Sequence, residues 1–433
     1  MIARRSEPSY CSGRVTNLVI TWVMMIPLAY FAGGFWLQNA RSTDATFLGY
    51  GVLASTPQPR DNAVTILVIF SIVFAAFLPK IRSILDACRA NLIFVALAGF
   101  AIISCLWSQF PMKSVERSAC LAVNTLFAFY LCRRFNSAQR LRLLYLFGWI
   151  AILLSVVLAI LFPRYGRSMM GGQEVWQGIY PHRNICATMT LLLLPAPFYI
   201  SPVTFLFRVG RAVYIGLSVF LILMSQSATG KVGLVCLLAY IGWLKIFKTF
   251  GSKDRAIVIV ISITAAAALI FAGMSYASKI AYALGRDPTI SGRADIWRFA
   301  LVSIAKQPFL GYGYSAFWSG PQGGPSGAAA AGPLAFHAHN VLLEILLELG
   351  LAGLVLFLFS VVKAVRDALS CLRAGRADYI FWCECIFVLV IATNFDESGL
   401  IIAPHNLSWI LYIVACVGLS EGAKNIRLRK GYE

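Results

Sequence analysis

The sequence predicts an all-α polytopic membrane protein with about 12 transmembrane helices and one large outward loop that carries an amphipathic helix. Three observations predict this class. Hydrophobic residues make up 59% of the 433 residues, charged residues only 13%, and the mean hydropathy is +0.76. Charge-poor stretches recur at the length needed to cross a bilayer, about 20 residues. These stretches do not alternate between polar and apolar residues, which favours helices over barrel strands.

The apolar windows define the predicted spans in chain order. They cover residues 16–37, 62–78, 91–107, 116–132, 142–162, 185–200, 211–225, 231–247, 256–276, 341–362, 379–395 and 406–420. The first window is long for a signal-peptide core and no small-residue cleavage site is evident, so we expect a retained helix. The chain therefore divides into residues 1–276 with nine helices, a loop at 277–340, and residues 341–433 with three helices and a tail.

The distribution of Lys and Arg predicts the orientation, because loops on the cytoplasmic side are enriched in these residues. If both termini are inside, 24 of the 37 basic residues and seven of the 18 acidic residues fall on the inner side. The net charges are then +17 inside and +2 outside, which together account for the total of +19. The basic balance thus reflects membrane topology, and we predict membrane lipids but no nucleic acid as partners.

Two outward loops are rich in polar residues. The first, residues 163–184, carries several Arg residues and His182. The second, residues 277–340, contains apolar side chains at helical spacing, namely Ile296, Phe299, Ala300, Ser303 and Ile304. This spacing predicts an amphipathic helix on the outer surface, which Pro308 would stop.

The second loop ends at a cluster that can perform acid–base chemistry. His337 and His339 are two of the four histidines in the chain, and Asn340 directly precedes an apolar helix. Imidazole titrates near neutral pH, so His339 can accept a proton from a hydroxyl group. Asn340 is expected to cap the helix, and Glu344, one turn further on, can orient the imidazole or a sugar hydroxyl. For His337, a role as a solvated loop residue is equally compatible with the sequence.

Outward cations indicate an anion site. Arg guanidinium groups bind phosphate oxygens in pairs of hydrogen bonds, which suits a diphosphate. The candidates are Arg167, Arg183, Arg293 with Trp297 beside it, and Lys231 at the start of the eighth predicted span. Any one of these could instead anchor the protein to lipid headgroups. Cationic donors can stabilise a diphosphate leaving group on their own, so we predict no metal ion and no cofactor.

The stretch from His339 resembles the signature of the O-antigen ligase and Wzy-type polysaccharide polymerase family. That signature is His-Asn, nine residues, Gly, two residues and Gly, and here it runs from His339 to Gly353 without a departure. Other stretches are similar to elements of the same family, and within it to ExoQ-type exopolysaccharide polymerases. They are residues 181–184, 225–231, Ser291-Gly292-Arg293 with Trp297, 308–313, and Trp107-Ser108 with Pro111, Ser114 and Arg117.

The resemblance implies a metal-independent glycosyltransferase in the bacterial inner membrane, and the distribution of Lys and Arg predicts that both termini are cytoplasmic. Its substrate would be an oligosaccharide on undecaprenyl diphosphate, transferred to an acceptor hydroxyl at the periplasmic face. The resemblance makes His339 the residue that activates the acceptor, and Arg293 and Arg183 the diphosphate ligands. Looser motifs add Arg167, Lys231 and Arg117, and His182 belongs to the same element as Arg183. A chain-length regulator and a flippase are further expected partners.

Two alternatives remain open at the level of sequence. A ligase would use the same groups to move a finished glycan to a lipid or protein acceptor, and only acceptor choice would separate it from a polymerase. A transporter or flippase predicts inverted repeats with broken helices at the membrane midplane. Pro195-Ala196-Pro197 lies in the sixth predicted span, but no counterpart occurs in the other half of the chain.

Overall fold

A computed structural model of the protein describes residues 20–32, 61–170, 172–201, 204–247, 249–251, 254, 293–318, 337–373, 378–394 and 407–430. The ninth predicted span, residues 256–276, lies outside these ranges. So do residues 277–292 and 319–336 of the predicted large loop.

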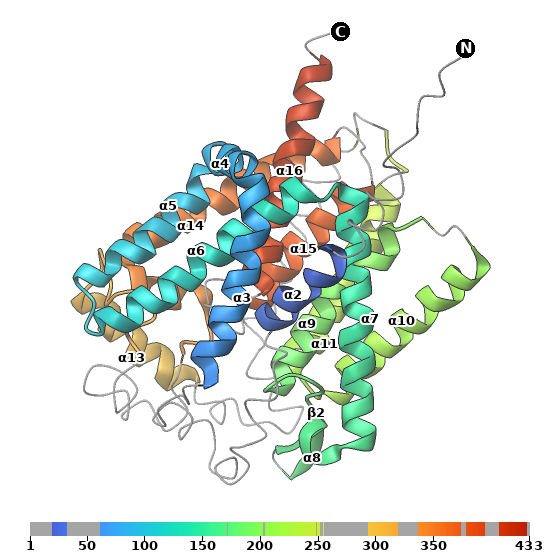
Figure 1. The fold of residues 1–433 in the computed structure, drawn as a ribbon, viewed down its shortest axis with the longest axis horizontal. Helices are drawn as coiled ribbons and strands as arrows, with labels where there is room; N and C mark the ends of the chain where they lie inside the picture. Colours follow the sequence, from blue (N-terminus) through green and yellow to red (C-terminus); the bar gives the residue numbers. More distant parts are fainter. Residues whose placement is uncertain are drawn as a thin grey trace, which may run out of the picture.

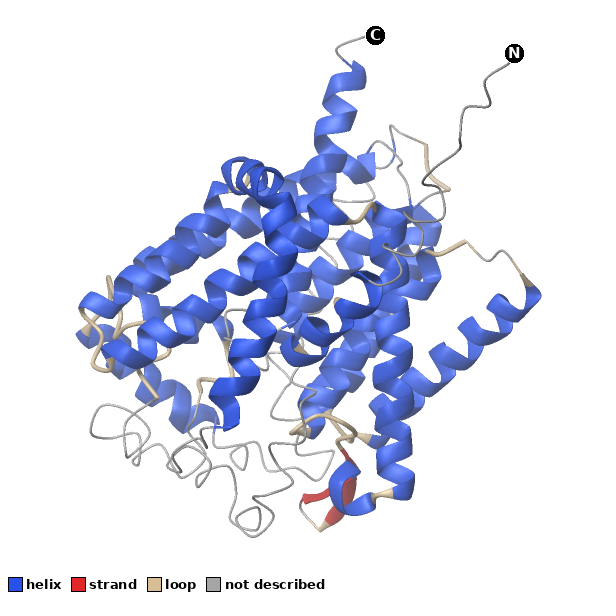
Figure 2. Ribbon diagram, in the orientation of Figure 1, coloured by secondary structure: helices blue, strands red, loops and turns tan. Residues whose placement is uncertain are grey.

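The all-α membrane class is confirmed (Figure 2). Within the described ranges, six helices are long and apolar enough to cross a membrane, and three shorter apolar helices accompany them. The remaining predicted windows within these ranges coincide with helices that are shorter or more polar, so the number of spans stays a prediction.

The elements of the first half are short α2 (Met25–Phe31), α3 (Asp61–Phe77), the 3-10 turn η2 (Leu78–Lys80), α4 (Ile81–Ala90), α5 (Leu92–Ile103), η3 (Ser104–Leu106), α6 (Pro111–Arg134), α7 (Ser137–Leu161) and α8 (Pro163–Gly166). They continue with β1 (Arg167–Met170), β2 (Gln173–Trp176), α9 (Arg183–Leu193) and η4 (Ala196–Tyr199). The second half contains α10 (Phe205–Met224), α11 (Ala228–Phe247), α13 (Arg293–Lys306), α14 (Val341–Arg373), α15 (Asp378–Asn394) and α16 (Leu407–Lys430).

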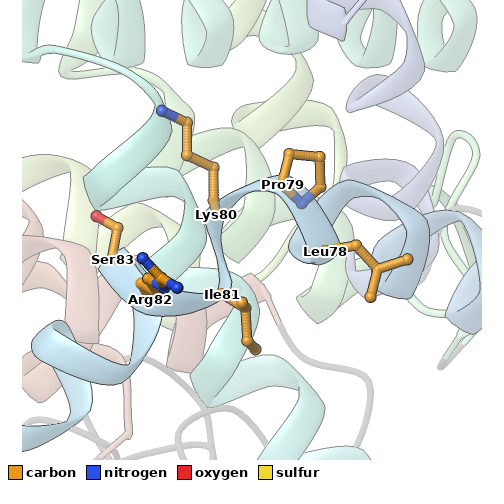
Figure 3. Close-up of a pocket in the computed structure, with 6 residues that line it drawn as sticks. All are labelled: Leu78, Pro79, Lys80, Ile81, Arg82 and Ser83. Carbon is orange, nitrogen blue, oxygen red and sulfur yellow. The ribbon is translucent and has the colours of Figure 1, made fainter.

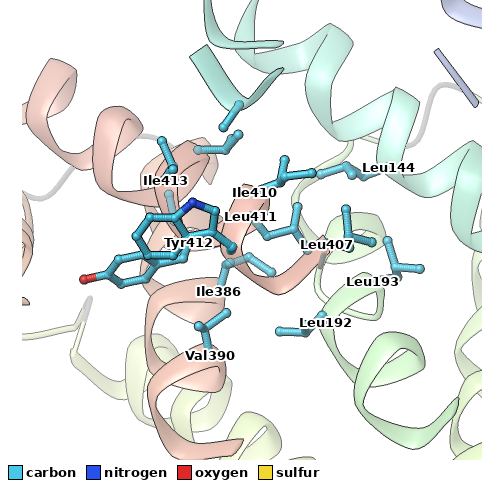
Figure 4. Close-up of a cluster of buried hydrophobic side chains, with 14 of the residues drawn as sticks. Leu144, Leu192, Leu193, Ile386, Val390, Leu407, Ile410, Leu411, Tyr412 and Ile413 are labelled. Atoms are coloured by element: carbon cyan, nitrogen blue, oxygen red, sulfur yellow. The ribbon is translucent and has the colours of Figure 1, made fainter. Parts of the chain in front are cut away.

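Helix α16 is at the centre of the bundle, in contact with α6, α14 and α15. Buried residues make up 83% of its apolar window, against 22% for α10. Its apolar side chains pack against those of α7, α9 and α15 (Figure 4). Two aromatic side chains also make polar contacts inside the bundle, since Trp409 Nε1 donates to Thr125 at 3.0 Å and the Tyr412 hydroxyl lies 2.8 Å from that of Ser360.

The sixth predicted span differs from the prediction. Residues 185–200 were expected to form one helix, but α9 ends at Leu193 and the chain continues through the short turn η4. Pro195 and Pro197 explain the break, because proline lacks the amide hydrogen and clashes with the preceding turn of a helix. The first outward loop also holds a small antiparallel hairpin, β1–β2, that the sequence did not predict (Figure 2).

Different elements lie at the two ends of the bundle (Figure 1). Helix α4 and the C-terminal end of α16 lie at one end, and α13, α8 and β2 lie at the other. At the α4 end the buried Asp367 carboxylate pairs with Lys363 at 3.0 Å and Arg427 at 3.5 Å. A surface hollow at this end is lined by residues 78–83 (Figure 3), far from the residues that the sequence predicts to be catalytic.

Helix α13 confirms the predicted amphipathic helix and ends at Lys306, just before Pro308. Its predicted apolar face is turned toward the protein: Ile296, Ala300 and Ser303 are buried, and the helix packs against α14. The opposite face is less polar than expected, since Leu301 and Val302 are exposed.

Candidate active site

His339, predicted to be catalytic, and His337, predicted to support it, lie in a tight turn before α14. Their rings are in contact, with centroids 3.9 Å apart and planes at 68°. His339 has a φ of 48°, a left-handed conformation that only a few per cent of residues other than glycine adopt. Such strained residues occur most often at functional sites, where the surrounding structure holds them in place.

Ala338, between the histidines, is held from two sides. Its backbone N–H donates to Glu344 Oε2 at 2.7 Å, and its carbonyl accepts a hydrogen bond from Trp297 Nε1 at 2.9 Å. The structure thus brings His337, His339, Glu344 and Trp297 together from α13, the turn and α14. Glu344 contacts the backbone of the turn, which favours a positioning role for this carboxylate, and its predicted catalytic role stays a prediction.

Asn340 is the N-cap of α14, as predicted. Its Oδ1 accepts hydrogen bonds from the amides of Leu342 at 3.0 Å and Leu343 at 3.2 Å. These amides lie in the first turn, where a helix has no internal acceptors. The cap fixes the direction in which the His-Ala-His turn enters the helix.

Helix α14 is broken at Gly350, whose φ of 62° and ψ of −163° are not helical. The break is filled by the chain segment that follows α13. Tyr312 and Gly313 donate their amides to the carbonyls of Leu347 and Glu348 at 2.8 and 3.0 Å. In return, the amides of Leu351 and Ala352 donate to the carbonyls of Pro308 and Phe309 at 2.8 and 3.1 Å. We call residues 308–315 the docked segment.

The docked segment is also held by the region around the start of α6. Trp107 Nε1 donates to the Leu310 carbonyl at 3.1 Å, and the Ser114 hydroxyl donates to the Tyr314 carbonyl at 2.8 Å. Tyr314 is fully buried, and this burial raises the pKa of its hydroxyl well above the ordinary value. The early element with Trp107 and Ser114 and the element at 308–313 therefore form one structural unit.

Arg117 belongs to the same unit. Its guanidinium donates to the Ser315 hydroxyl at 2.6 Å, and Ser315 has a positive φ of 55°. The contact gives Arg117 a role in anchoring the docked segment. Its predicted role as a diphosphate ligand remains a prediction that this contact does not favour.

Two other predicted cations converge on one residue. Arg183 begins α9 and Lys231 lies in the first turn of α11. The Arg183 guanidinium donates to the backbone carbonyl of Gln226 at 3.2 Å, and Lys231 Nζ donates to Gln226 Oε1 at 2.8 Å. Gln226 lies in the hairpin between α10 and α11, within the stretch 225–231 that resembles a family element, but no role was predicted for this residue.

The starts of α9 and α11 are adjacent because the two helices run side by side in the same direction. Gly230 approaches Ala187, and one turn further along Gly233 approaches Leu191, so closely that an added Cβ would overlap both neighbours. Each helix contributes a partial positive charge at its N-terminal end. Together with Arg183 and Lys231, they make this region suitable for an anion.

His182 and Arg167 have structural contacts. His182 caps α9, with Nδ1 accepting the Asn184 amide at 3.3 Å. Arg167 donates to Glu174 and to the Ala159 carbonyl at 3.0 and 2.6 Å, and it stacks over Trp176. The structure therefore ties Arg167 into the β1–β2 hairpin and does not bring it to Gln226. Arg293 begins α13 one turn before Trp297, and its side chain lies outside the described part of the chain.

Comparison with known proteins relates part of this chain to a described family. Residues 213–358 match a family model described as O-antigen ligase. This stretch of the chain is similar to the O-antigen ligase family. The matched stretch begins within α10 and includes α11, α13, the docked segment, the histidine turn and α14 as far as Leu358. Arg117, Arg167 and Arg183 precede it.

Individual relatives support this assignment. The chain is 24% identical over 379 residues to the exopolysaccharide production protein ExoQ of Rhizobium meliloti (strain 1021), covering 82% of this chain and 83% of ExoQ. It is 30% identical over 137 residues to an inferred polysaccharide ligase of Rickettsia prowazekii, covering 30% of this chain and 33% of that protein. A similar protein of Rickettsia conorii is 37% identical over 88 residues, covering 19% of this chain and 21% of that protein.

Two substitutions of Glu344 distinguish a carboxylate that positions the histidine turn from one that transfers a proton. In Glu344→Gln the side-chain carbonyl can still accept the Ala338 amide, so we expect kcat to stay within about fivefold of wild type. Glu344→Ala leaves that partly buried amide without this acceptor, and we expect kcat to fall by about 10- to 100-fold. Initial rates of glycan transfer by the two variants measure the difference. Equal, large losses in both would instead make the carboxylate a proton-transfer group.

Proposed function

We propose that the protein polymerises oligosaccharide repeat units carried on undecaprenyl diphosphate. In each cycle the acceptor hydroxyl of one unit attacks the anomeric carbon of a chain held on a second lipid. A new glycosidic C–O bond forms, the bond from the anomeric carbon to the diphosphate oxygen breaks, and lipid diphosphate leaves with the electron pair. The hydroxyl proton passes to the His339 imidazole. A single displacement of this kind inverts the configuration at the anomeric carbon.

The observation that carries the proposal is the convergence of Arg183 and Lys231 on Gln226 at two adjacent helix starts. Two fixed cations and two helix N-termini match a diphosphate, whose charge increases as it leaves. Both cations lie in regions whose sequence resembles elements of the family. Arg293 would add a third cation from α13.

The geometry of the histidine turn supports the other part of the proposed reaction, which is the activation of the acceptor hydroxyl. Trp297, Glu344 and the Asn340 cap fix its backbone, so the His339 ring can be presented to an acceptor in one orientation. Preorganised groups of this kind lower the barrier because the enzyme does not need to rearrange during the reaction. Figure 1 shows α13 and the β2 region that precedes α9 at the same end of the bundle. We assign this end to the periplasm, with both termini in the cytoplasm.

A ligase is the second candidate. The match over most of the chain is to a protein named for exopolysaccharide production, which favours polymer formation. The shorter matches are to proteins named as inferred polysaccharide ligases, which favours transfer of a finished glycan. The two reactions use the same base and leaving group and differ in the acceptor.

The test is product analysis with purified protein in liposomes that contain one defined lipid-linked unit. We expect products that lengthen in steps of one repeat unit, with one undecaprenyl diphosphate released for each new linkage. Mass spectrometry measures both quantities, and no nucleotide or added metal is supplied. A single transfer, occurring only when a second acceptor is added, would establish a ligase. Movement of the unit across the bilayer without a new linkage would establish a transporter and overturn the proposal.

A further inference from the structure

Gln226 has an unusual conformation for a solvent-exposed glutamine. It is in the hairpin between α10 and α11, and its φ of 55° is in the left-handed region. Glycine and asparagine adopt that region more readily than glutamine. A strained residue persists where the surrounding structure holds it, and this occurs most often where the residue has a function.

The surrounding hairpin is built to hold this conformation. The Ser225 hydroxyl donates to the Ile222 carbonyl at 2.6 Å, and the Ser227 amide donates to Ser225 Oγ at 3.3 Å. The Gly230 amide donates to Ser227 Oγ at 3.2 Å. Both serines are fully buried. The strain at Gln226 is therefore supported by buried hydrogen bonds on either side of it.

Both oxygens of Gln226 are directed at the cations. The backbone oxygen accepts from Arg183 at 3.2 Å and the side-chain Oε1 accepts from Lys231 at 2.8 Å. These two acceptors occupy the positions at which oxygens of an anion would meet the same two donors. Because the amide is neutral, its bond to Lys231 is weaker than one between an ammonium and a charged phosphate oxygen.

We propose that Gln226 is a neutral placeholder that sets the affinity of this site for a diphosphate. This inference rests on the proposed function. In the empty site Gln226 keeps Lys231 and Arg183 aligned, and on binding Lys231 exchanges Gln226 Oε1 for a diphosphate oxygen. The neutral amide gives way to a charged diphosphate, whereas a carboxylate at this position would hold Lys231 and repel the substrate. Two separated cations favour a diphosphate over the single phosphodiester of a phospholipid.

Gln226→Glu tests the placeholder, because it changes the charge and leaves the shape. We expect KM for the lipid-linked unit to rise about tenfold with kcat within about twofold of wild type. The inhibition constant for inorganic pyrophosphate should rise in parallel, and both effects should shrink as salt is added. Gln226→Asn suits the left-handed turn but is too short to reach Lys231, so it introduces no carboxylate that holds the lysine, and we expect its KM to lie several-fold below that of Gln226→Glu.

Gln173→Glu is the matched control. It makes the same change of charge at an exposed position on β2, and we expect no change in either constant. Equal increases in KM for Gln226→Glu and Gln226→Asn would overturn the placeholder and leave Gln226 as a hairpin residue only. So would a fall in kcat with unchanged KM in Gln226→Glu.

A direct measurement of pyrophosphate binding tests the role of Gln226 independently of the proposed reaction. Titration calorimetry of the detergent-solubilised protein with inorganic pyrophosphate needs no turnover. We expect wild type to bind it more tightly than Gln226→Glu, and to bind glycerophosphate, a single phosphate ester, much more weakly. If wild type does not elongate glycan but this order of binding holds, the proposed reaction fails and the placeholder stands. If pyrophosphate binds both proteins equally, the placeholder fails.

Discussion

Replacement of His339 by alanine is expected to lower kcat for glycan transfer by about 10²- to 10⁴-fold, the usual contribution of a general base. KM for the lipid-linked unit should change little, because His339 is not one of the groups proposed to bind diphosphate, which lie on α9, α11 and α13. Cells that depend on this variant should accumulate lipid-linked single units. Initial rates with the purified variant in liposomes, together with the chain lengths formed, measure the effect.

The backbone at His339 requires a second variant. Its φ of 48° disfavours most side chains, so alanine could disturb the turn as well as remove the imidazole. Asparagine tolerates the left-handed region, and His339→Asn therefore removes the base while keeping the turn. We expect the two variants to lose similar activity. An Asn variant that retains more than about one fifth of wild-type kcat would rule out His339 as the base.

His337 provides a further comparison. Its ring contacts that of His339, with centroids 3.9 Å apart, so it helps to set the orientation of the imidazole. His337→Phe keeps an aromatic ring at this position and should reduce kcat far less than His339→Asn. The order of the two losses distinguishes the residue that accepts the proton from the residue that supports it.

Features that depend on local sequence could be predicted. Apolar length defined most of the helices, because backbone groups in lipid must be satisfied within one segment. The stop of α13 before Pro308 and the cap by Asn340 follow from the chemistry of single residues. The apolar face of α13 was also predicted correctly, and in the structure this helix packs against α14.

Features that depend on pairing between distant segments could not be predicted. Trp107 and Leu310 are 203 residues apart, and their hydrogen bond has no periodic pattern in the sequence. The break at Gly350 was hidden within a long apolar stretch, where glycine alone does not reveal a partner segment. The spacing from His339 to Gly350 was recognised only through the resemblance. In the structure it is the distance along the chain between the histidine turn and the break in α14 at which the docked segment binds.

The arginines show a different limit of prediction from sequence. A guanidinium binds a carboxylate, a carbonyl or a phosphate through the same donors, so residue type does not identify its partner. Arg167 contacts Glu174, Arg117 contacts Ser315, and Arg183 contacts Gln226. Of these three, Arg183 alone has a second cation beside it that contacts the same acceptor residue. Only the three-dimensional arrangement separates an anion site from a structural contact.

Replacement of Gly350 by alanine is expected to abolish activity and to destabilise the protein. An added Cβ would overlap the main chain of Phe309 and Leu310, and the φ of 62° with ψ of −163° is accessible essentially to glycine alone, at a cost of about 1–3 kcal/mol for other residues. Undocking the segment would also remove four hydrogen bonds, each contributing about 0.5–1.5 kcal/mol. The apparent melting temperature in detergent should fall by at least about 5 °C.

Gly216→Ala is the matched control for this prediction, since Gly216 lies within helix α10 and an added Cβ there would meet open space. The control should be as stable as wild type or slightly more stable, because alanine favours a helix more than glycine does. Activity should be unchanged. A Gly350→Ala protein that has the melting temperature of the control and still transfers glycan would show that docking of residues 308–315 at the break is needed neither for stability nor for activity. If activity is lost while the melting temperature is unchanged, the break at Gly350 affects the active site and not the stability of the whole protein.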